Sequence, residues 1–156
     1  MAKVLDRLYA TDYYAWTLEQ AAALRRLAAE GADMPLDLDH LAEAVEDLGK
    51  SERRAVRRQT RRLLEHLLKL QHATAEAPRA GWRRSIVDAR IERADDLTPT
   101  LRREIEADLA TLYNAAREQA TDALAAHGET VTLPEQCPSP LDQLLRRQWY
   151  PYRTVR

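Results

Sequence analysis

The stretch from Asp37 to His72 constrains the fold more than any other part of the chain. Its apolar residues recur at steps of three and four, which is the period of an α-helix. These residues are Leu41, Val45, Leu48, Val56, Leu63, Leu67 and Leu70. Asp37 and Asp39 are both suitable N-caps, because a short carboxylate side chain can accept from the free amides of a first turn. The stretch therefore predicts one long amphipathic helix with a single apolar stripe facing a core.

Polar residues interrupt this stripe. At about 100° per residue, Glu52 falls within the stripe, Gln59 at its edge and His66 just outside it. We expect Glu52 to be buried in an ion pair with an arginine from the helix after Trp82 or the helix after Thr98-Pro99, with His66 in the same network. General acid–base chemistry by this acid and histidine is the alternative. Gly49 lies on the same side, where it costs about 1 kcal/mol of helix propensity but would let a neighbouring helix come close.

The opposite face of the same helix carries six arginines that stack at four-residue spacing. They are Arg53, Arg54, Arg57, Arg58, Arg61 and Arg62. Like charges at this spacing repel each other, so acids of another helix, a polyanion or solvent must compensate them. The segment from Lys50 to Arg93 holds 13 basic and 5 acidic residues, and the remainder holds 11 and 20, so the net charge of −1 conceals a strong asymmetry.

The rest of the chain predicts further helices and no strands. We expect helices from Thr11 or Asp12 to about Glu30, from Trp82 to Leu97, from Thr98-Pro99 to about His127, and a short one from Ser139-Pro140 through Trp149. In the helix after Trp82, Ile86 and either Ala89 or Arg90 point inward. Trp16 and one neighbouring tyrosine are expected in the core. The predicted fold is all-α, an irregular four-helix bundle with a short extra C-terminal helix, in a single domain over 1–156 with 1–11 and 150–156 loosely ordered.

Composition limits the cellular setting and the chemistry. One cysteine rules out an internal disulfide and zinc sites built from cysteine clusters. There is no long apolar run and no signal-peptide hydrophobic region, so we expect a cytoplasmic protein with no membrane partner. Cys137 precedes a proline in a loop and has no identifiable histidine base, so we expect a half-buried loop residue and no catalytic cysteine.

A carboxylate–histidine metal site is the other chemistry for which the sequence offers candidate residues. His40 and Glu43 are three residues apart on one helical face, and Glu52 and His66 follow on the same helix. The sequence contains neither the Glu-x-x-His pairs of di-metal bundles nor a His-Glu-x-x-His motif. A capped, solvated helix start is the preferred interpretation of His40 and Glu43. We therefore expect no metal, no cofactor and no catalytic residues, with these four side chains as the candidates if a metal is bound.

Several segments resemble a known bacterial family, the domain of unknown function twenty-nine. The resemblance spans nearly the whole chain and is carried by Tyr13–Trp16, Leu38–Arg53, His66–Lys69, Trp82–Ile86, Cys137–Pro138 and Leu141–Leu145. It implies a small helical protein and no particular activity, so no site residue is transferred. Such relatives usually continue with an acidic stretch after the paired leucines, where this chain has Arg146-Arg147.

These observations rank three functions. The first is a non-enzymatic helical interaction module whose partner is another protein or a second copy of the chain, because a long helix with acidic and basic halves can associate by charge complementarity. The alternative is binding of nucleic acid or another polyanion through the arginine face, with a steep dependence on salt. A metal-dependent or acid–base enzyme centred on Glu52, His66 and the His40–Glu43 pair comes third.

Overall fold

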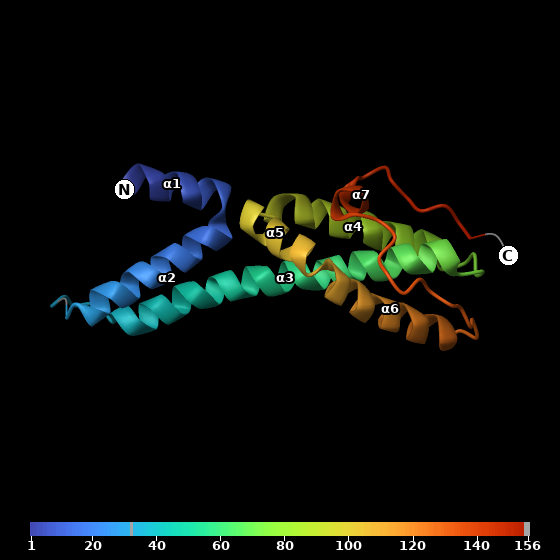
Figure 1. Cartoon of the computed structure of the whole chain (residues 1–156), viewed down its shortest axis with the longest axis horizontal. Coiled ribbons are helices and arrows are strands. Elements are labelled where there is room, and N and C mark those ends of the chain that lie inside the picture. Colours follow the sequence, from blue (N-terminus) through green and yellow to red (C-terminus); the bar gives the residue numbers. More distant parts are fainter. Residues whose placement is uncertain (32, 155–156) are drawn as a thin grey trace. The chain divides into compact units, whose positions relative to one another are not determined.

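The computed structural model of the chain describes residues 1–31 and 33–154. Within these residues the chain forms seven helices and no strand (Figure 1). They are α1 (Ala2–Thr11), α2 (Tyr13–Ala29), α3 (Leu38–His72), α4 (Arg79–Asp96), α5 (Pro99–Ala107), α6 (Leu109–Ala125) and α7 (Leu141–Leu145). The all-α prediction is confirmed, and α3 is the single long helix that its apolar period indicated. No helix among the described residues has the length and apolar content needed to cross a membrane.

Four boundaries differ from the sequence prediction, and the smallest difference is the start of α4, which lies at Arg79 and not at Trp82. Residues 2–11, expected as a loosely ordered lead-in, form helix α1. The predicted fourth helix is broken at Asp108, whose backbone leaves the helical region (φ −108°, ψ 12°) and whose carboxylate forms an ion pair with Arg57. The last helix ends at Leu145 and not at Trp149. Its Leu144 carbonyl accepts a hydrogen bond from Arg90 Nε (2.9 Å), and Arg146 is already extended.

The described chain divides into two compact units. The first comprises 1–56 and 97–103, and the second comprises 57–96 together with the chain from residue 104 onward. Helix α3 contributes its first half to one unit and its second half to the other.

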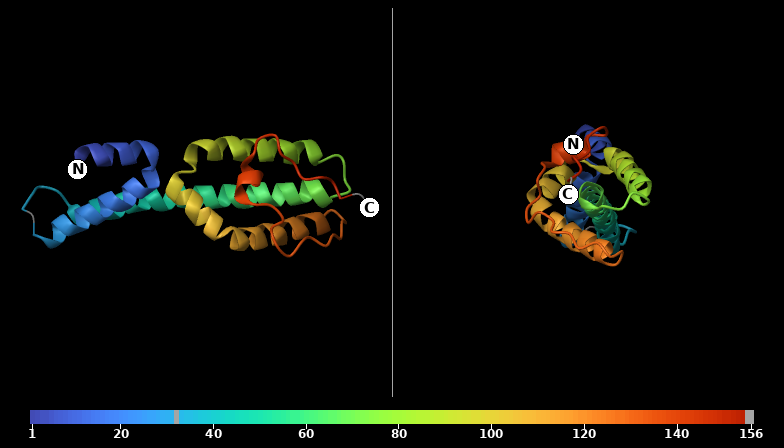
Figure 2. Two further views of the ribbon diagram at one scale, coloured as in Figure 1. Left: turned by 45° about the horizontal axis from the view of Figure 1, so that its top comes forward. Right: turned by 90° about the vertical axis from the view of Figure 1, so that its right-hand side faces the viewer.

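In the first unit, α2 runs antiparallel to the first half of α3, and α1 folds back on α2 (Figures 1 and 2). An aromatic cluster joins α1 to α2: the ring centroids of Tyr9 and Trp16 lie 4.8 Å apart, and those of Tyr13 and Trp16 lie 5.6 Å apart. Trp16 is half-buried in this cluster, whereas Tyr14 on the adjacent face is buried. The core position expected for one tyrosine is thus confirmed, while Trp16 packs at the edge.

Gly49 sets how closely α2 approaches α3. A Cβ atom added to Gly49 would lie 2.2 Å from Thr17 Oγ1 and 3.3 Å from Thr17 Cβ, well inside normal contact distance. Thr17 is completely buried, and its hydroxyl donates to the carbonyl of Tyr14 (2.7 Å) within α2. The prediction that this glycine admits a neighbouring helix is confirmed.

The apolar stripe of α3 is only partly covered in this unit. Leu38, Ala42 and Val56 are buried, but Leu41 is 40% exposed and Leu48 is 50% exposed. The expectation that Leu41 and Leu48 face a core is therefore wrong. The reason is geometrical: one helix, α2, packs against this half of α3, and a single partner covers only one flank of a broad stripe.

Asp12 caps two helices at once. One carboxylate oxygen accepts from the backbone amide of Ala15 in α2 (3.0 Å), and the other accepts from the amide of Thr100 in the first turn of α5 (2.8 Å). Asp12 is only 6% exposed. Burial alone would raise the pKa of this carboxyl, but hydrogen bonds from Ala15, Thr100 and Thr98 outweigh burial and lower the pKa below its ordinary value of 3.8.

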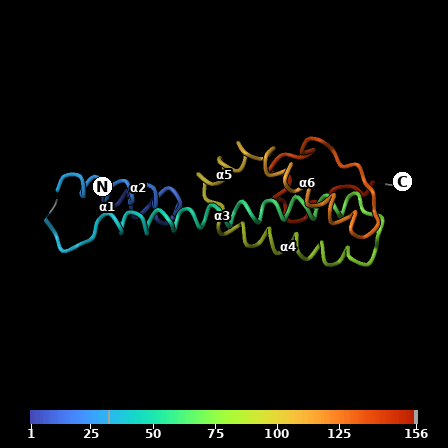
Figure 3. Tube along the Cα trace, turned by 90° about the horizontal axis from the view of Figure 1, so that it is seen from below, coloured from blue at the N-terminus to red at the C-terminus, as the bar shows by residue number. Residues whose placement is uncertain are grey.

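In the second unit, the second half of α3 lies between α4 and α6 (Figure 3). Its buried leucines cover a wide arc of the helix, as expected for an element with neighbours on two sides. They are Leu63, Leu64, Leu67, Leu68 and Leu70. Ile86 of α4, Leu112 and Leu124 of α6, and Leu141 of α7 are buried in the same unit.

Substitution of Asp12 should change how stability depends on pH. Because the folded-state pKa is lowered, the contribution of Asp12 is complete above about pH 4 and is lost as pH falls through the folded-state value. Asp12→Asn should therefore lower the free energy of unfolding at pH 7 by about 1–2 kcal/mol. It should also make the free energy of unfolding depend less on pH below about pH 4. Urea unfolding between pH 2.5 and 7 measures this, with the exposed Asp6→Asn as control. If the free energy of unfolding of Asp12→Asn fell with acid as steeply as that of the wild type, the lowered pKa of Asp12 would be contradicted.

Gly49→Ala should destabilise the protein although alanine favours helices. The propensity gain of about 1 kcal/mol is opposed by a clash with Thr17 that forces α2 and α3 apart, for which overpacking costs of about 1–3 kcal/mol are typical. We expect a lower melting temperature by circular dichroism, with partial recovery when Thr17→Ala is added. Gly81→Ala is the control, because a Cβ there meets no atom within 4 Å. Equal melting temperatures for the two alanine variants would argue against close packing at Gly49.

Candidate functional site

The second unit contains a pocket between the C-terminal end of α3, the connection 73–78, the start of α4 and the end of α6. Its volume is about 640 Å³, which is within the range of small-molecule sites. Most of its lining is apolar and comes from Ala75, Ala77, Pro78, Trp82, Ala123 and Leu124. Three polar side chains, Lys69, His127 and Glu129, complete the wall.

Lys69 supplies the positive charge of this wall. Its side chain is largely buried, and its Nζ atom donates to Glu65 Oε1 at 2.7 Å, one helical turn earlier in α3. The same Nζ lies 5.6 Å from the centre of the Trp82 ring, within the range of a cation–π contact. An ammonium group carries three N–H donors, so these contacts leave donor capacity on the pocket side.

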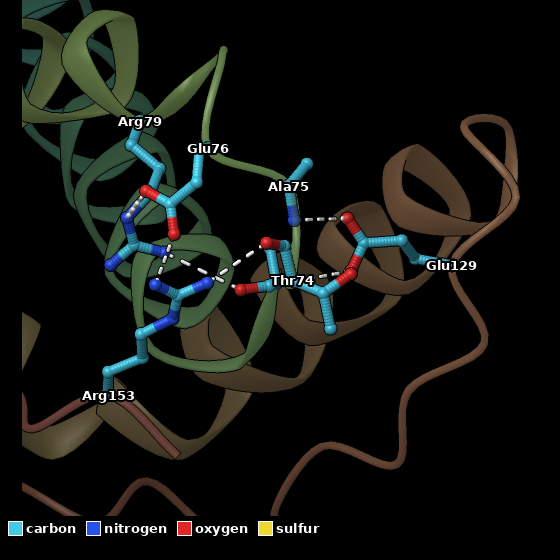
Figure 4. A network of polar contacts seen from close by, with 7 residues as sticks. Thr74, Ala75, Glu76, Arg79, Glu129 and Arg153 are labelled. Carbon is cyan, nitrogen blue, oxygen red and sulfur yellow. Dashed lines mark hydrogen bonds and ion pairs between the residues drawn. The ribbon is translucent and has the colours of Figure 1, made fainter. Parts of the chain in front are cut away.

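Glu129 holds the connection that follows α3. Its two carboxylate oxygens accept from the backbone amides of Thr74 (2.6 Å) and Ala75 (3.1 Å), as Figure 4 shows. These amides follow the last turn of α3 and would otherwise need water as a partner. The carboxylate therefore fixes one wall of the pocket, and its charge is compensated by two backbone donors.

The C-terminal segment holds the same connection from the other side. Arg153 forms an ion pair with Glu76 and donates to the carbonyl of Thr74 at 2.9 Å (Figure 4). The amide of Thr154 donates to the carbonyl of Gln71 at 2.9 Å. Burial, and next the positive charge of Arg153, lower the pKa of Arg79, which also contacts Glu76. Residues through 154 are thus attached to the end of α3.

The predicted arginine face is only partly available to a ligand. Arg57 forms its ion pair with Asp108, and Arg62 Nη2 lies 3.4 Å from the Ser85 hydroxyl of α4. Arg54 and Arg58 are exposed, and neither has an ion-pair partner among the described residues. Arg53 is exposed and Arg61 half-buried. Neighbouring elements thus engage Arg57 and Arg62, while Arg54 and Arg58 face solvent.

Glu52 does not have the environment that the sequence predicted. It is half-buried and forms no ion pair among the described residues, so the expected buried pair with an arginine is wrong. On the helical wheel it lies between the exposed Leu48 and the buried Val56, which leaves it partly open to solvent. His66 instead donates from Nδ1 to the carbonyl of Arg62 (2.8 Å), within α3, and burial lowers its pKa.

The candidate metal ligands are not brought together. His40 Nδ1 lies 2.6 Å from Asp37 Oδ2 at the exposed start of α3, and this contact raises the pKa of His40 and lowers that of Asp37. Asp37 also accepts from the His40 amide (3.2 Å), as predicted for an N-cap. Glu43 is exposed. Over the residues 1–31 and 33–154, no group of three or more His, Cys, Asp or Glu side chains is placed to hold a metal ion.

Cys137 is half-buried in a loop, as predicted. Its thiol donates to the carbonyl of Ser139 (3.3 Å), and burial raises its pKa. A raised thiol pKa disfavours the thiolate, which is the nucleophilic form.

Two arginines of α4 are buried: Arg90, which the sequence indicated only as an alternative to Ala89, and Arg93, which sequence reasoning missed. Arg90 donates to the carbonyls of Leu144 (2.9 Å) and Arg147 (3.2 Å) beneath the ring of Tyr150. Arg93 is 1% exposed, and none of its three guanidinium nitrogens has a hydrogen-bond partner in the described part of the chain. Burial, and next the charge of Arg90, lower the pKa of Arg93 to about 10. The available signal was their spacing from Ile86, which continues the inward period of α4.

Comparison with known proteins identifies the family. The family described as "Domain of unknown function DUF29" matches residues 8–150. The chain belongs to this family. The DUF29 chain is also similar to the crystal structure of an α-helical protein of unknown function from Rhodospirillum rubrum. The two share 30% sequence identity over 90% of each chain, with a TM-score of 0.79. A search of curated proteins found no match. The predicted resemblance is thereby confirmed.

Arg93→Met should stabilise the protein. Methionine has a similar length and carries no charge, and replacement of buried charged groups by apolar ones has stabilised other proteins by about 1–4 kcal/mol. We expect a higher urea midpoint with an unchanged slope. Arg84→Met on the exposed side of the same helix is the matched control and should change stability by less than about 0.5 kcal/mol. A lower urea midpoint for Arg93→Met would mean that the surroundings of the Arg93 guanidinium stabilise its charge in solution.

Proposed function

We propose that this chain is a non-enzymatic helical interaction module, and that its partner is a second copy of itself. The observation that carries the proposal is the exposed apolar row on α3 in the first unit. Leu41 and Leu48 are seven residues apart, and the exposed Ala44 lies between them. This is the spacing of core positions in a coiled coil, where a helix packs against a partner along one seam. Rows of exposed leucines at this spacing commonly mark an interaction surface.

The charges beside this row favour an antiparallel second copy. Within the part of α3 that belongs to the first unit, the acids Glu43 and Asp47 precede the exposed apolar centre at Leu48, and the bases Lys50 and Arg54 follow it. An antiparallel copy centred near Leu48 places the acidic half of each helix beside the basic half of the other. A parallel copy would place like charges together, which is unfavourable. The symmetric arrangement uses the same patch on both copies, as two-fold dimers do.

Arg54 and Glu43 are the pair best placed to set this orientation. On the helical wheel both lie on the flank of the exposed row that points away from α2. Both are exposed, and neither has an ion-pair partner among the described residues. Across an antiparallel interface centred near Leu48, each Arg54 would lie beside Glu43 of the other copy, so the contact would form twice.

Polyanion binding through the arginine face has less support. Arg57 and Arg62 contact neighbouring elements of their own chain, and phosphate recognition gains its strength from several unpaired cations acting together. Polyanion binding is the alternative outcome of the association experiment.

Removal of the exposed leucines should weaken self-association. Leu41→Gln combined with Leu48→Gln should raise the dissociation constant of the dimer about 10,000-fold, if each of the four leucines lost from the symmetric dimer contributes about 1.5 kcal/mol of burial. Sedimentation equilibrium over a concentration series measures it. The matched control is Val87→Gln with Ile91→Gln, a second exposed apolar pair, on α4 (40% and 47% exposed). A concentration-independent monomer mass for the wild type would refute the proposal.

The same experiment distinguishes the orientation and the polyanion alternative. Arg54→Glu or Glu43→Lys alone should weaken the dimer, and the two together should restore it, because the charges are exchanged. Failure of the double variant to recover would exclude antiparallel pairing through these residues. The protein could instead remain monomeric and form a complex with mixed-sequence RNA or DNA at low salt that dissociates as salt rises. This result would favour polyanion binding over self-association.

A further inference from the structure

We propose that the pocket of the second unit binds a small, largely apolar organic acid, through its apolar wall and the ammonium group of Lys69. This inference does not depend on self-association, because the pocket belongs to the second unit and the exposed row belongs to the first.

The wall fits an apolar ligand because several of its side chains are short. Ala75, Ala77 and Ala123 line the pocket, and Trp82 is the largest apolar side chain in its wall. The volume of about 640 Å³ exceeds what one or two waters occupy and matches sites for small organic molecules. An aromatic or branched aliphatic group could cover the Trp82 ring and remove apolar surface from water.

The polar groups indicate which charge the ligand carries. Lys69 Nζ uses one contact to Glu65 and faces the Trp82 ring, which leaves further N–H donors. Glu129 is the one acid in the wall, and both of its oxygens are occupied by the amides of Thr74 and Ala75. His127 directs Nδ1 to the carbonyl of Ala123 at 2.8 Å. The group that can still donate hydrogen bonds is therefore the cationic ammonium of Lys69, and it can bind a carboxylate or a sulfonate.

The pocket is also held in shape before a ligand arrives. The connection 73–78 is fixed by Glu129 on one side and by the Arg153 contacts with Glu76 and Thr74 on the other (Figure 4). A wall that is already ordered loses less conformational entropy on binding than a mobile one. This favours binding of a small molecule whose contact area is limited.

A pair of fluorescent probes tests both parts of the proposal on the full chain. 8-Anilinonaphthalene-1-sulfonate is an aromatic anion, and N-phenyl-1-naphthylamine has the same rings without the charge. The wild type should bind one equivalent of each, the anion more tightly by about tenfold. Lys69→Gln should abolish this preference by weakening the anion alone, whereas Lys50→Gln, an exposed lysine of α3, should leave it unchanged.

Bulky substitutions that fill the pocket test whether the probes bind there. Ala123→Phe should weaken both probes at least about tenfold, because the ring occupies the apolar volume, and Ala125→Phe on the exposed side of the same helix should not. Ala77→Phe fills the pocket from the connection 73–78 if Ala123→Phe fails to fold by circular dichroism. Equal effects of the filling and control variants would overturn the site. Equal affinity of the wild type for both probes would overturn the anionic ligand class.

Discussion

One unbroken helix must supply packing surfaces to two compact units, and this constraint decides the residues along α3. In the first unit one helix, α2, packs against α3. The small residues Gly49 and Ala42 of α3 are buried there, and Gly49 lets the face of α2 that carries Thr17 come close. In the second unit two helices flank it, and the contact is made broad by leucines such as Leu63, Leu64 and Leu68. Small residues permit short helix–helix distances, whereas leucines fill the space between three helices. The two halves therefore differ in composition although their backbone is the same.

This difference explains where apolar surface and cavities remain. A two-helix contact covers one flank of each helix, so the first unit keeps exposed leucines that a third helix would otherwise cover. In the second unit three helices and the C-terminal segment converge, and alanines of the connection 73–78 and of α6 leave a volume that larger side chains would fill. The candidate interaction surface and the candidate ligand site thus arise from the packing of each unit, and neither requires a special motif.

Local signals predicted much of this fold, and long-range contacts account for the rest. The period of α3, the cap at Asp12 and the close approach at Gly49 depend on residues a few positions apart or on the absence of a side chain, so the sequence could reveal them. The break at Asp108 depends on an arginine of another helix, and the burial of Arg93 depends on which helices surround α4. Leu48 shows the same limit: a helical stripe indicates which residues share a face but not whether a neighbour covers all of it. The pocket residues were not predicted, because no spacing rule relates α3, α4 and α6.

The double cap at Asp12 also has a consequence for biosynthesis. One carboxylate serves Ala15, three residues away, and Thr100, which is 88 residues further along the chain. While the chain emerges from the ribosome, the first of these bonds can form as soon as α2 is made. The second must wait until the start of α5 has left the exit tunnel. Until then the second oxygen of Asp12 stays hydrated, and the completed first unit can form only late in translation.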